Sequence, residues 1–295
     1  MGHHHHHDRA AEGRIGTAFA LNLVFTIIEF IGGILTNSTA ILADAVHDLG
    51  DSLSIGLGWV LARLGRRPAT GQYTYGYQRL SLLGALINAL VLIAGSLWVL
   101  SEAIPRLSDP PMPHATGMAW LAVLGVTVNG AAAWSLSRGR SLNERVLNWH
   151  LLEDVLGWVA VLIVAIVLQF ADWPILDPLL SIAFTLFILF NVVRNLRETV
   201  RLFLQAAPEA GMAEEIEQKL LRLPHVVDVH HLHLWSLDGE HHVLTAHLVL
   251  DIPLSAETQR EVKEAIRKAC ESCDISHTTI ELEQADEACR HEIGH

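Results

Sequence analysis

Charged residues are scarce in the first two thirds of this 295-residue sequence. Before residue 208 the chain has no lysine, and its 13 arginines stand against 14 acidic residues. From residue 208 onward there are 7 basic and 18 acidic residues, so most of the formal net charge of −12 lies in the last third. This distribution excludes the basic surface of a nucleic-acid-binding protein, and we expect no nucleic-acid partner.

Cysteine is also rare, with only Cys270, Cys273 and Cys289. An odd and clustered set of three does not fit the disulfide framework of a small secreted protein, so a reducing, cytoplasmic setting is the simpler interpretation for the last third. The run His3–His7 has two interpretations, a purification tag or a natural metal-gathering tail, and no conclusion depends on it.

Apolar residues, by contrast, make up 51% of the sequence, and they gather in six stretches that are each long enough to cross a bilayer as a helix. Connections rich in arginine alternate with connections that have almost none, so the positive-inside rule predicts that both termini are cytoplasmic. The predicted spans are Thr17–Leu35, Ala40–Leu64, Leu80–Leu100, Ala115–Leu136, Leu147–Leu168 and Ile175–Val193.

The pattern changes after Arg201, where short amphipathic segments replace the long apolar ones. The predicted order is helix, strand, strand, helix, strand, which is typical of a small two-layer α+β domain of the split βαβ kind. The fold class is therefore a membrane α-helical protein with six transmembrane helices followed by a small cytoplasmic α+β domain. The predicted boundaries are 1–16 for an N-terminal tail, 17–201 for the transmembrane domain, 202–211 for a linker and 212–295 for the cytoplasmic domain.

Two of the predicted spans carry ionisable residues, which are costly inside a bilayer and usually functional. His47 and Asp51 in the second span have the same spacing as His150 and Asp154 in the fifth. Residues at i and i+4 project from one face of a helix, so two such faces turned toward each other would supply two imidazoles and two carboxylates. That donor set suits tetrahedral Zn²⁺, whereas the alternative is that these residues only pair with one another in the core.

Histidines are also concentrated in the cytoplasmic domain. Strand alternation places His233, His247, His277 and Glu283 on one polar face of the predicted sheet, which is again a zinc-like set. Further candidate ligands are His230, His231 and Glu281, and Cys270 and Cys273 as soft ligands. The alternatives are a solvated polar sheet face and free thiols at a helix end.

Several motifs together resemble the cation diffusion facilitator family over about Thr17–Glu283. They are Glu29-Phe-Ile-Gly-Gly, Asn37-Ser-x-Ala-x-Leu-Ala-Asp44-Ala-x-His47-x-x-x-Asp51, His150-Leu-x-x-Asp154, His231-Leu-His233-Leu-Trp-Ser and Thr245-Ala-His247-Leu.

The resemblance implies a homodimer in a lipid membrane, which we expect to be a bacterial inner membrane. It implies export of Zn²⁺ in exchange for protons by alternating access, with the transport site on the two His-x-x-x-Asp pairs and metal at His233 and His247 in the cytoplasmic domain. Zn²⁺ is the expected cargo and regulatory ion, and Co²⁺, Cd²⁺, Fe²⁺ and Ni²⁺ remain open. Tyr73 and Tyr77 stand where some relatives have loop histidines, so we expect no metal site in that loop.

Two other functions fit parts of the pattern: an intramembrane metalloenzyme and a membrane metal sensor that does not transport. Against the enzyme, the sequence has no His-Glu-x-x-His motif, and one metal could use all four intramembrane ligands. A catalytic zinc keeps an open position instead, so we expect no enzymatic activity.

Overall fold

The computed structural model describes residues 4–65, 67–136, 142–251, 255–271, 273, 275–287 and 289, without the side chains of 4–18, 62, 135–136, 142–148 and 150. The chain divides into two compact units, each described by itself below. The first, the helical unit, comprises Met1–Leu61 and Gly84–Leu196, and the second comprises Ala62–Leu83 and Arg197–His295.

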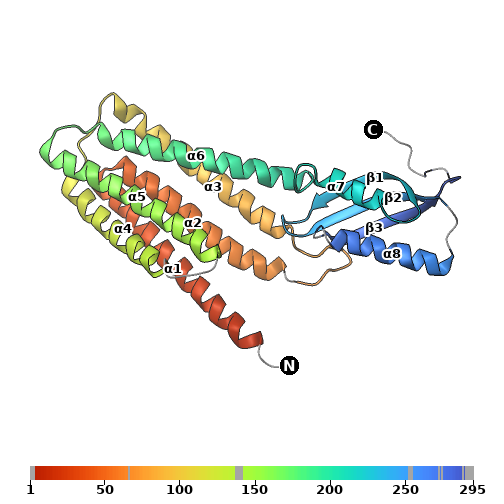
Figure 1. Cartoon of the computed structure of the whole chain (residues 1–295). Coiled ribbons are helices and arrows are strands. Elements are labelled where there is room, and N and C mark those ends of the chain that lie inside the picture. Colours follow the sequence, from red (N-terminus) through yellow and green to blue (C-terminus); the bar gives the residue numbers. More distant parts are fainter. Residues whose placement is uncertain are drawn as a thin grey trace. The chain divides into compact units, whose positions relative to one another are not determined.

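Six long helices, which run alongside one another in Figure 1, account for most of the helical unit. All of them except α2 contain a stretch long and apolar enough to cross a membrane. The exception is the helix whose apolar sequence is interrupted by Asp44, Asp48 and Asp51. The helices are α1 (His4–Thr36), α2 (Thr39–Gly65), α3 (Leu80–Ala103), α4 (Ala115–Leu136), α5 (Leu142–Phe170) and α6 (Leu176–Phe203).

Helix α2 contributes to both buried cores of the helical unit. Its Ile41 belongs to a core with Met118 of α4 and Trp158 of α5, and its Val46 belongs to a second core with α3 and α6. Helices α4 and α5 approach each other closely, because a Cβ atom at Gly125 would lie only 2.2 Å from the Trp158 ring. The carboxylates and imidazole of α2 are therefore held between helices rather than on the outside of the bundle.

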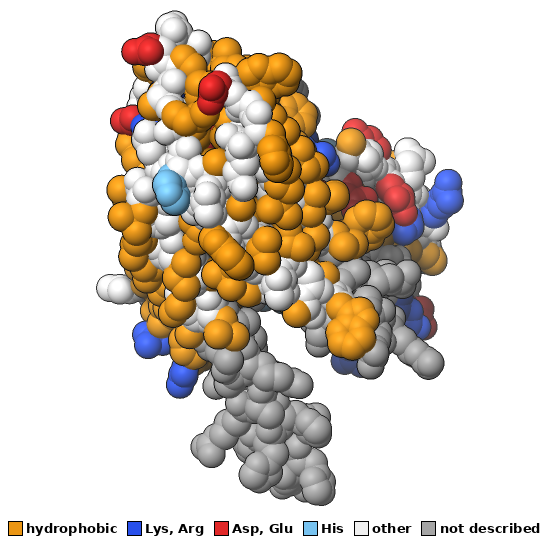
Figure 2. Space-filling view, turned by 90° about the vertical axis from the view of Figure 1, so that its left-hand side faces the viewer, with side chains coloured by type: hydrophobic (Ala, Val, Ile, Leu, Met, Phe, Trp, Pro, Cys, Tyr) orange, Lys and Arg blue, Asp and Glu red, His pale blue; other side chains and the backbone are white. Residues whose placement is uncertain are grey.

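The outer surface of the helical unit is apolar. Figure 2 shows hydrophobic side chains over most of this unit on the face in view, and large exposed side chains include Trp120, Phe170 and Phe190. A soluble protein rarely exposes so much contiguous apolar area, whereas a bilayer covers it. Together with the apolar helices, this surface identifies a multi-pass integral membrane protein.

The second unit contains a small α+β domain in the predicted order. Its elements are α7 (Met212–Leu221), β1 (Val226–Ser236), β2 (His242–Leu250), α8 (Ala256–Glu271) and β3 (Ile275–Gln284). The sheet order is β1-β2-β3, with β1 antiparallel and β3 parallel to the central strand β2. The predicted fold class is confirmed: a helical membrane domain is followed by a three-stranded sheet with two helices.

The core of this domain forms between the helices and one face of the sheet. Ile216 and Leu220 of α7 and Val262 and Ile266 of α8 pack against the buried side chains of the strands, of which Leu248 is fully buried. The domain thus has a hydrophobic core of its own, and the polar side chains of the strands remain available for a site.

Candidate metal centres

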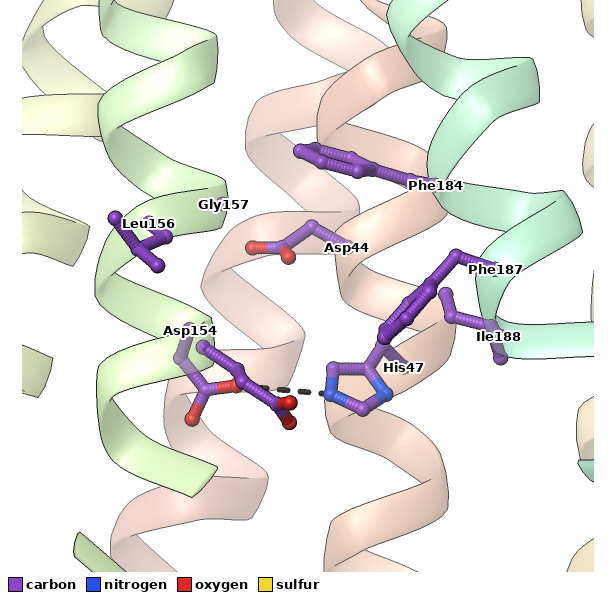
Figure 3. Close-up of a pocket in the computed structure, with 9 residues that line it drawn as sticks. Asp44, His47, Asp154, Leu156, Gly157, Phe184, Phe187 and Ile188 are labelled. Atoms are coloured by element: carbon purple, nitrogen blue, oxygen red, sulfur yellow. Dashed lines mark ion pairs between the residues drawn. The ribbon is translucent and has the colours of Figure 1, made fainter. Parts of the chain in front are cut away.

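The first candidate centre lies between α2 and α5. The Nε2 atom of His47 is 3.8 Å from Oδ2 of Asp51, one turn later on α2, and 3.6 Å from Oδ1 of Asp154 on α5. Figure 3 shows the His47 ring and the Asp154 carboxylate pointing toward each other. Each of the three residues offers a ligand atom, and all three atoms lie within 4.8 Å of one another. The structure therefore brings together three of the four residues predicted for the transport site.

The fourth predicted ligand, His150, lies outside the described side chains. It belongs to α5, four residues before Asp154, and i and i+4 positions share a helix face. Its role as a metal ligand remains a prediction.

A cavity of about 260 Å³ adjoins the first centre. Polar groups of α2 and α5 reach it from one side, and α6 contributes an apolar wall (Figure 3). Its lining residues are Asp44, His47, Glu153, Asp154, Leu156, Gly157, Phe184, Phe187 and Ile188. The cavity gives space beside the His47 imidazole for a hydrated or partly hydrated ion.

Helix α1 contacts the same region through an amide. Asn22 donates hydrogen bonds to the backbone oxygen of Asp48 at 3.2 Å and to Oγ of Ser52 at 3.0 Å. These bonds fix α1 against the ligand-bearing part of α2, so Asn22 links two helices and does not line the cavity.

The second candidate centre lies on the sheet of the cytoplasmic domain. Nδ1 of His247 on β2 is 2.6 Å from Oε1 of Glu283 on β3, and Nε2 of His230 on β1 is 3.1 Å from Oε2 of the same carboxylate. Sγ of Cys289 is 3.6 Å from Nδ1 of His247. These four residues form the sheet cluster, with one ligand atom from each within 4.8 Å of the others.

Two further predicted residues lie at the edge of the sheet cluster. The ring of His231 is 5.1 Å from that of His247 between centroids, and Oε2 of Glu281 is 3.6 Å from Nε2 of His247. Three imidazoles and two carboxylates therefore gather within a few ångströms.

Electrostatics at the sheet cluster favour an ionised carboxylate. Burial alone would raise the pKa of Glu283, but the hydrogen bond with His247 and the charges of His230 and His247 outweigh it and hold that pKa below its usual value. An ionised carboxylate, two imidazoles and a thiol make a donor set that fits tetrahedral zinc.

The sheet cluster does not include His233 or His277, although the strand pairing leaves both on the same face of the sheet as His247, as strand alternation predicts. The pairing of β1 with β2 shifts between His230 and His233, so His230 lies opposite His247 and His233 lies opposite Thr245. The backbone at His231 adopts φ 48°, which produces this bulge. His233 is exposed, and the exposed ring of His277 makes an edge contact with Tyr75 at 5.3 Å between centroids.

The helix-end cysteines also lie outside both groups of potential ligands in the described part of the chain. Cys270 is buried in the hydrophobic core, and burial together with the neighbouring Cys273 raises its pKa to about 11. Cys273 accepts a hydrogen bond from Nζ of Lys219 at 3.1 Å. A buried, protonated thiol is a poor metal ligand, so packing explains Cys270 better than coordination does.

Comparison with known protein families divides the chain into a membrane domain and a cytoplasmic domain, in agreement with the fold. A cation efflux transmembrane domain matches residues 16–204, and a cation efflux protein cytoplasmic domain matches residues 208–285.

Curated relatives cover nearly the whole chain. The cadmium, cobalt and zinc/H⁺-K⁺ antiporter of Bacillus subtilis (strain 168) is 32% identical over 95% of this chain and 91% of its own length. The metal cation efflux system protein CzcD of Cupriavidus metallidurans is 33% identical over 96% and 90%, and the zinc transporter ZitB of Escherichia coli (strain K12) is 32% identical over 92% and 87%. The relatives are metal transporters and not enzymes, and the chain belongs to the cation efflux family, the cation diffusion facilitators.

Proposed function

We propose that this protein exports Zn²⁺ from the cytoplasm in exchange for protons, with His47, Asp51, His150 and Asp154 as ligands of the travelling ion. The observation that carries the proposal is the position of the His47 imidazole between a carboxylate of its own helix and one of α5. Two relatives support zinc as cargo, because the Bacillus subtilis protein is named for cadmium, cobalt and zinc and the Escherichia coli protein for zinc alone. Cd²⁺ and Co²⁺ are the alternative cargoes that these names support.

Proton coupling follows from the ligand chemistry. Metal binds only the deprotonated forms of imidazole and carboxylate, so its arrival displaces whatever protons the site holds. Two ionised aspartates neutralise Zn²⁺, and the loaded site can then be enclosed within the protein at modest cost. An empty site with two bare buried carboxylates would be strongly penalised, so it should return carrying protons. The cycle is then an exchange by alternating access.

The cytoplasmic domain would hold a second, resident Zn²⁺ at the sheet cluster. Because its ligands come from all three strands and the segment after β3, the ion would stabilise the folded domain and report cytoplasmic metal. The match to the cation efflux cytoplasmic domain supports a homodimer built partly through this domain. The arginine distribution supports cytoplasmic termini, and the bacterial relatives support an inner-membrane location.

The test is Zn²⁺ flux into sealed proteoliposomes with an imposed proton gradient and a clamped membrane potential. Acid on the extracytoplasmic side should accelerate export, and replacing both His47 and His150 with Asn should reduce both the rate and its dependence on the gradient. If the flux does not depend on the proton gradient, antiport is contradicted and a passive facilitator is favoured. Absence of flux from folded, Zn²⁺-binding protein would favour a metal sensor instead.

A further inference from the structure

The carboxylate of Asp177, at the beginning of α6, is buried against the beginning of α2. Its Oδ1 accepts a hydrogen bond from Oγ of Ser38 at 2.5 Å, and its Oδ2 accepts from the backbone N and Oγ of Thr39 at 2.7 and 2.8 Å. The backbone N of Ala40 donates to Oδ1 at 3.3 Å. The residue is only 2% exposed, so these four bonds replace the water that an ionised carboxylate would otherwise require.

The turn before α2 explains why these donors are available. Asn37 adopts φ 53° and ends α1, and α2 begins two residues later at Thr39. The first N–H groups of any helix lack partners within that helix and carry partial positive charge. Oγ of Ser38 accepts from the backbone N of Ile41, but the two N–H groups before it are taken by a carboxylate from another helix.

A second bond strengthens the same contact. Oγ of Ser181, one turn after Asp177 on α6, donates to the backbone oxygen of Thr39 at 2.9 Å, and Ser181 is fully buried. We call the contact of Asp177 and Ser181 with Ser38, Thr39 and Ala40 the α2–α6 pin.

The next turns of α6 contact the rest of the helical unit quite differently. Phe184, Phe187 and Ile188 form the apolar wall of the cavity beside His47, and Phe187 is 56% exposed. Separating this segment from α2 and α5 would break apolar contacts, some around the cavity and some in the core that Ile188 shares with α2. Separating the pin would leave a buried carboxylate and the two N–H groups of Thr39 and Ala40 without partners, which is far more costly.

We propose that Asp177 is a positioning residue that keeps the beginnings of α2 and α6 together throughout the transport cycle, so that the site is uncovered by movement of the Phe184–Ile188 segment. The inference deepens the proposed function and rests on it. It assigns the pin as the fixed point and the apolar wall as the moving part.

Substitution of Asp177 tests its role first. Asp177→Ala should lower Zn²⁺ flux by about tenfold or more, as expected when a site is displaced by roughly 1 Å. Asp177→Asn keeps an acceptor oxygen and should recover part of the flux. Asp172→Ala, which removes an exposed carboxylate five residues earlier, is the matched control and should transport normally. Equal flux in Asp177→Ala and Asp172→Ala would overturn the assignment.

Cross-linking then separates a fixed contact from a merely stabilising one. In the double variant Ser38→Cys/Asp177→Cys, a short bis-thiol reagent should restore flux, because a covalent link replaces the hydrogen bonds. In Gly157→Cys/Phe184→Cys the same reagent should abolish flux, because it ties α5 to the moving wall. A Cβ atom at Gly157 lies 3.8 Å from Cζ at the tip of the Phe184 ring, so a reagent about as long as the lost ring would bridge this pair. Treated wild-type protein, with the same three native cysteines, controls for the reagent.

The outcomes are distinguishable. If wild-type protein transports but the linked 38/177 protein does not, the two helix beginnings must separate and the inference fails. If wild-type protein itself does not transport, the proposed function fails instead. Where a variant is inactive before linking, the cross-linking yield still decides: Zn²⁺ should change it at 157/184 and leave it unchanged at 38/177, and the reverse result would contradict the inference.

Discussion

The centre beside α2 and α5 and the sheet cluster both combine imidazole with carboxylate, yet they hold their side chains differently. At the first, His47 is 3.6 to 3.8 Å from its two carboxylates, and its side chain is 28% exposed beside a cavity. At the second, His247 is 2.6 Å from a Glu283 side chain that is only 5% exposed, and a thiol completes the set. Wider spacing and an adjoining space suit an ion that must leave, and close packing suits an ion that stays.

The largest expected effect concerns the first centre, in the helical unit, and tests whether its two carboxylates bind the transported ion. Asp51→Ala or Asp154→Ala should reduce Zn²⁺ flux by roughly 100-fold or more, because losing a residue that only supports a metal ligand already costs up to that factor. Flux in proteoliposomes measures the effect, and Asp109→Ala, an exposed carboxylate of the loop before α4, is the control. Near-normal flux in both variants would rule out these ligands.

The next effect concerns the cytoplasmic domain and distinguishes its ligands from their neighbours. A fragment of residues 208–295 should be stabilised by about 2.7 kcal/mol at a Zn²⁺ concentration 100 times the Kd. His230→Ala/His247→Ala should abolish this shift, whereas His233→Ala/His277→Ala should keep most of it. Thermal denaturation with and without Zn²⁺ provides the measurement. The opposite pattern would restore the ligand set predicted from strand alternation.

A smaller effect concerns selectivity at the transport site. His47→Asp replaces a nitrogen ligand with an adaptable carboxylate, so the Zn²⁺/Cd²⁺ rate ratio should fall by about tenfold or less, since geometry and donor type tune such preferences. The same vesicles supplied with either metal give the ratio. An unchanged ratio would count against a selectivity role for His47, and unchanged Zn²⁺ binding by the cytoplasmic domain would show that the two centres are independent.

The smallest effect is a pH dependence of the metal-free domain. The pKa of Glu283 lies below its usual value in the folded state, so its ionised form stabilises the fold above the ordinary glutamate pKa, and this contribution is lost as pH falls through the folded value. Glu283→Gln should therefore lower stability by on the order of 1 kcal/mol at neutral pH. The difference from wild type should begin to shrink as pH falls below the ordinary glutamate pKa of about 4.3 and should vanish once pH is below the folded-state value. Glu240→Gln, in the exposed hairpin turn, should show no such convergence.

Much of this architecture could be predicted because it depends on patterns that extend over many residues. Each long apolar run predicts one long helix, although α1 begins at His4 and α6 continues to Phe203, beyond the predicted spans. The His-x-x-x-Asp spacing depends only on helical periodicity, which places His47 and Asp51 on one face near Asp154. The order of elements in the cytoplasmic domain follows from alternating and amphipathic segments in the same way.

The ligands of the sheet cluster could not be predicted fully, for a local reason. Strand alternation holds only while the backbone stays extended, and the bulge at His231, with φ 48°, brings His230 onto the face that carries His247 without moving His233 off it. Simple alternation along β1 therefore favours His231 and His233 and gives no reason to expect His230 on that face. Cys289 follows the last strand, where periodicity offers no guide, and only the folded chain brings it to His247.

The bulge at His231 also carries an evolutionary consequence. A β-carbon-bearing residue in the left-handed region costs roughly 1–2 kcal/mol, which glycine would avoid. Selection for the thermal stability of the domain alone would thus tend to replace His231, and the domain would lose one of its three clustered imidazoles. A laboratory search for thermostable variants should find glycine at position 231 early, and those variants would lose the imidazole that lies beside the sheet cluster. The strained backbone at His231 marks a position where the stability of the fold and the supply of an imidazole to the site compete.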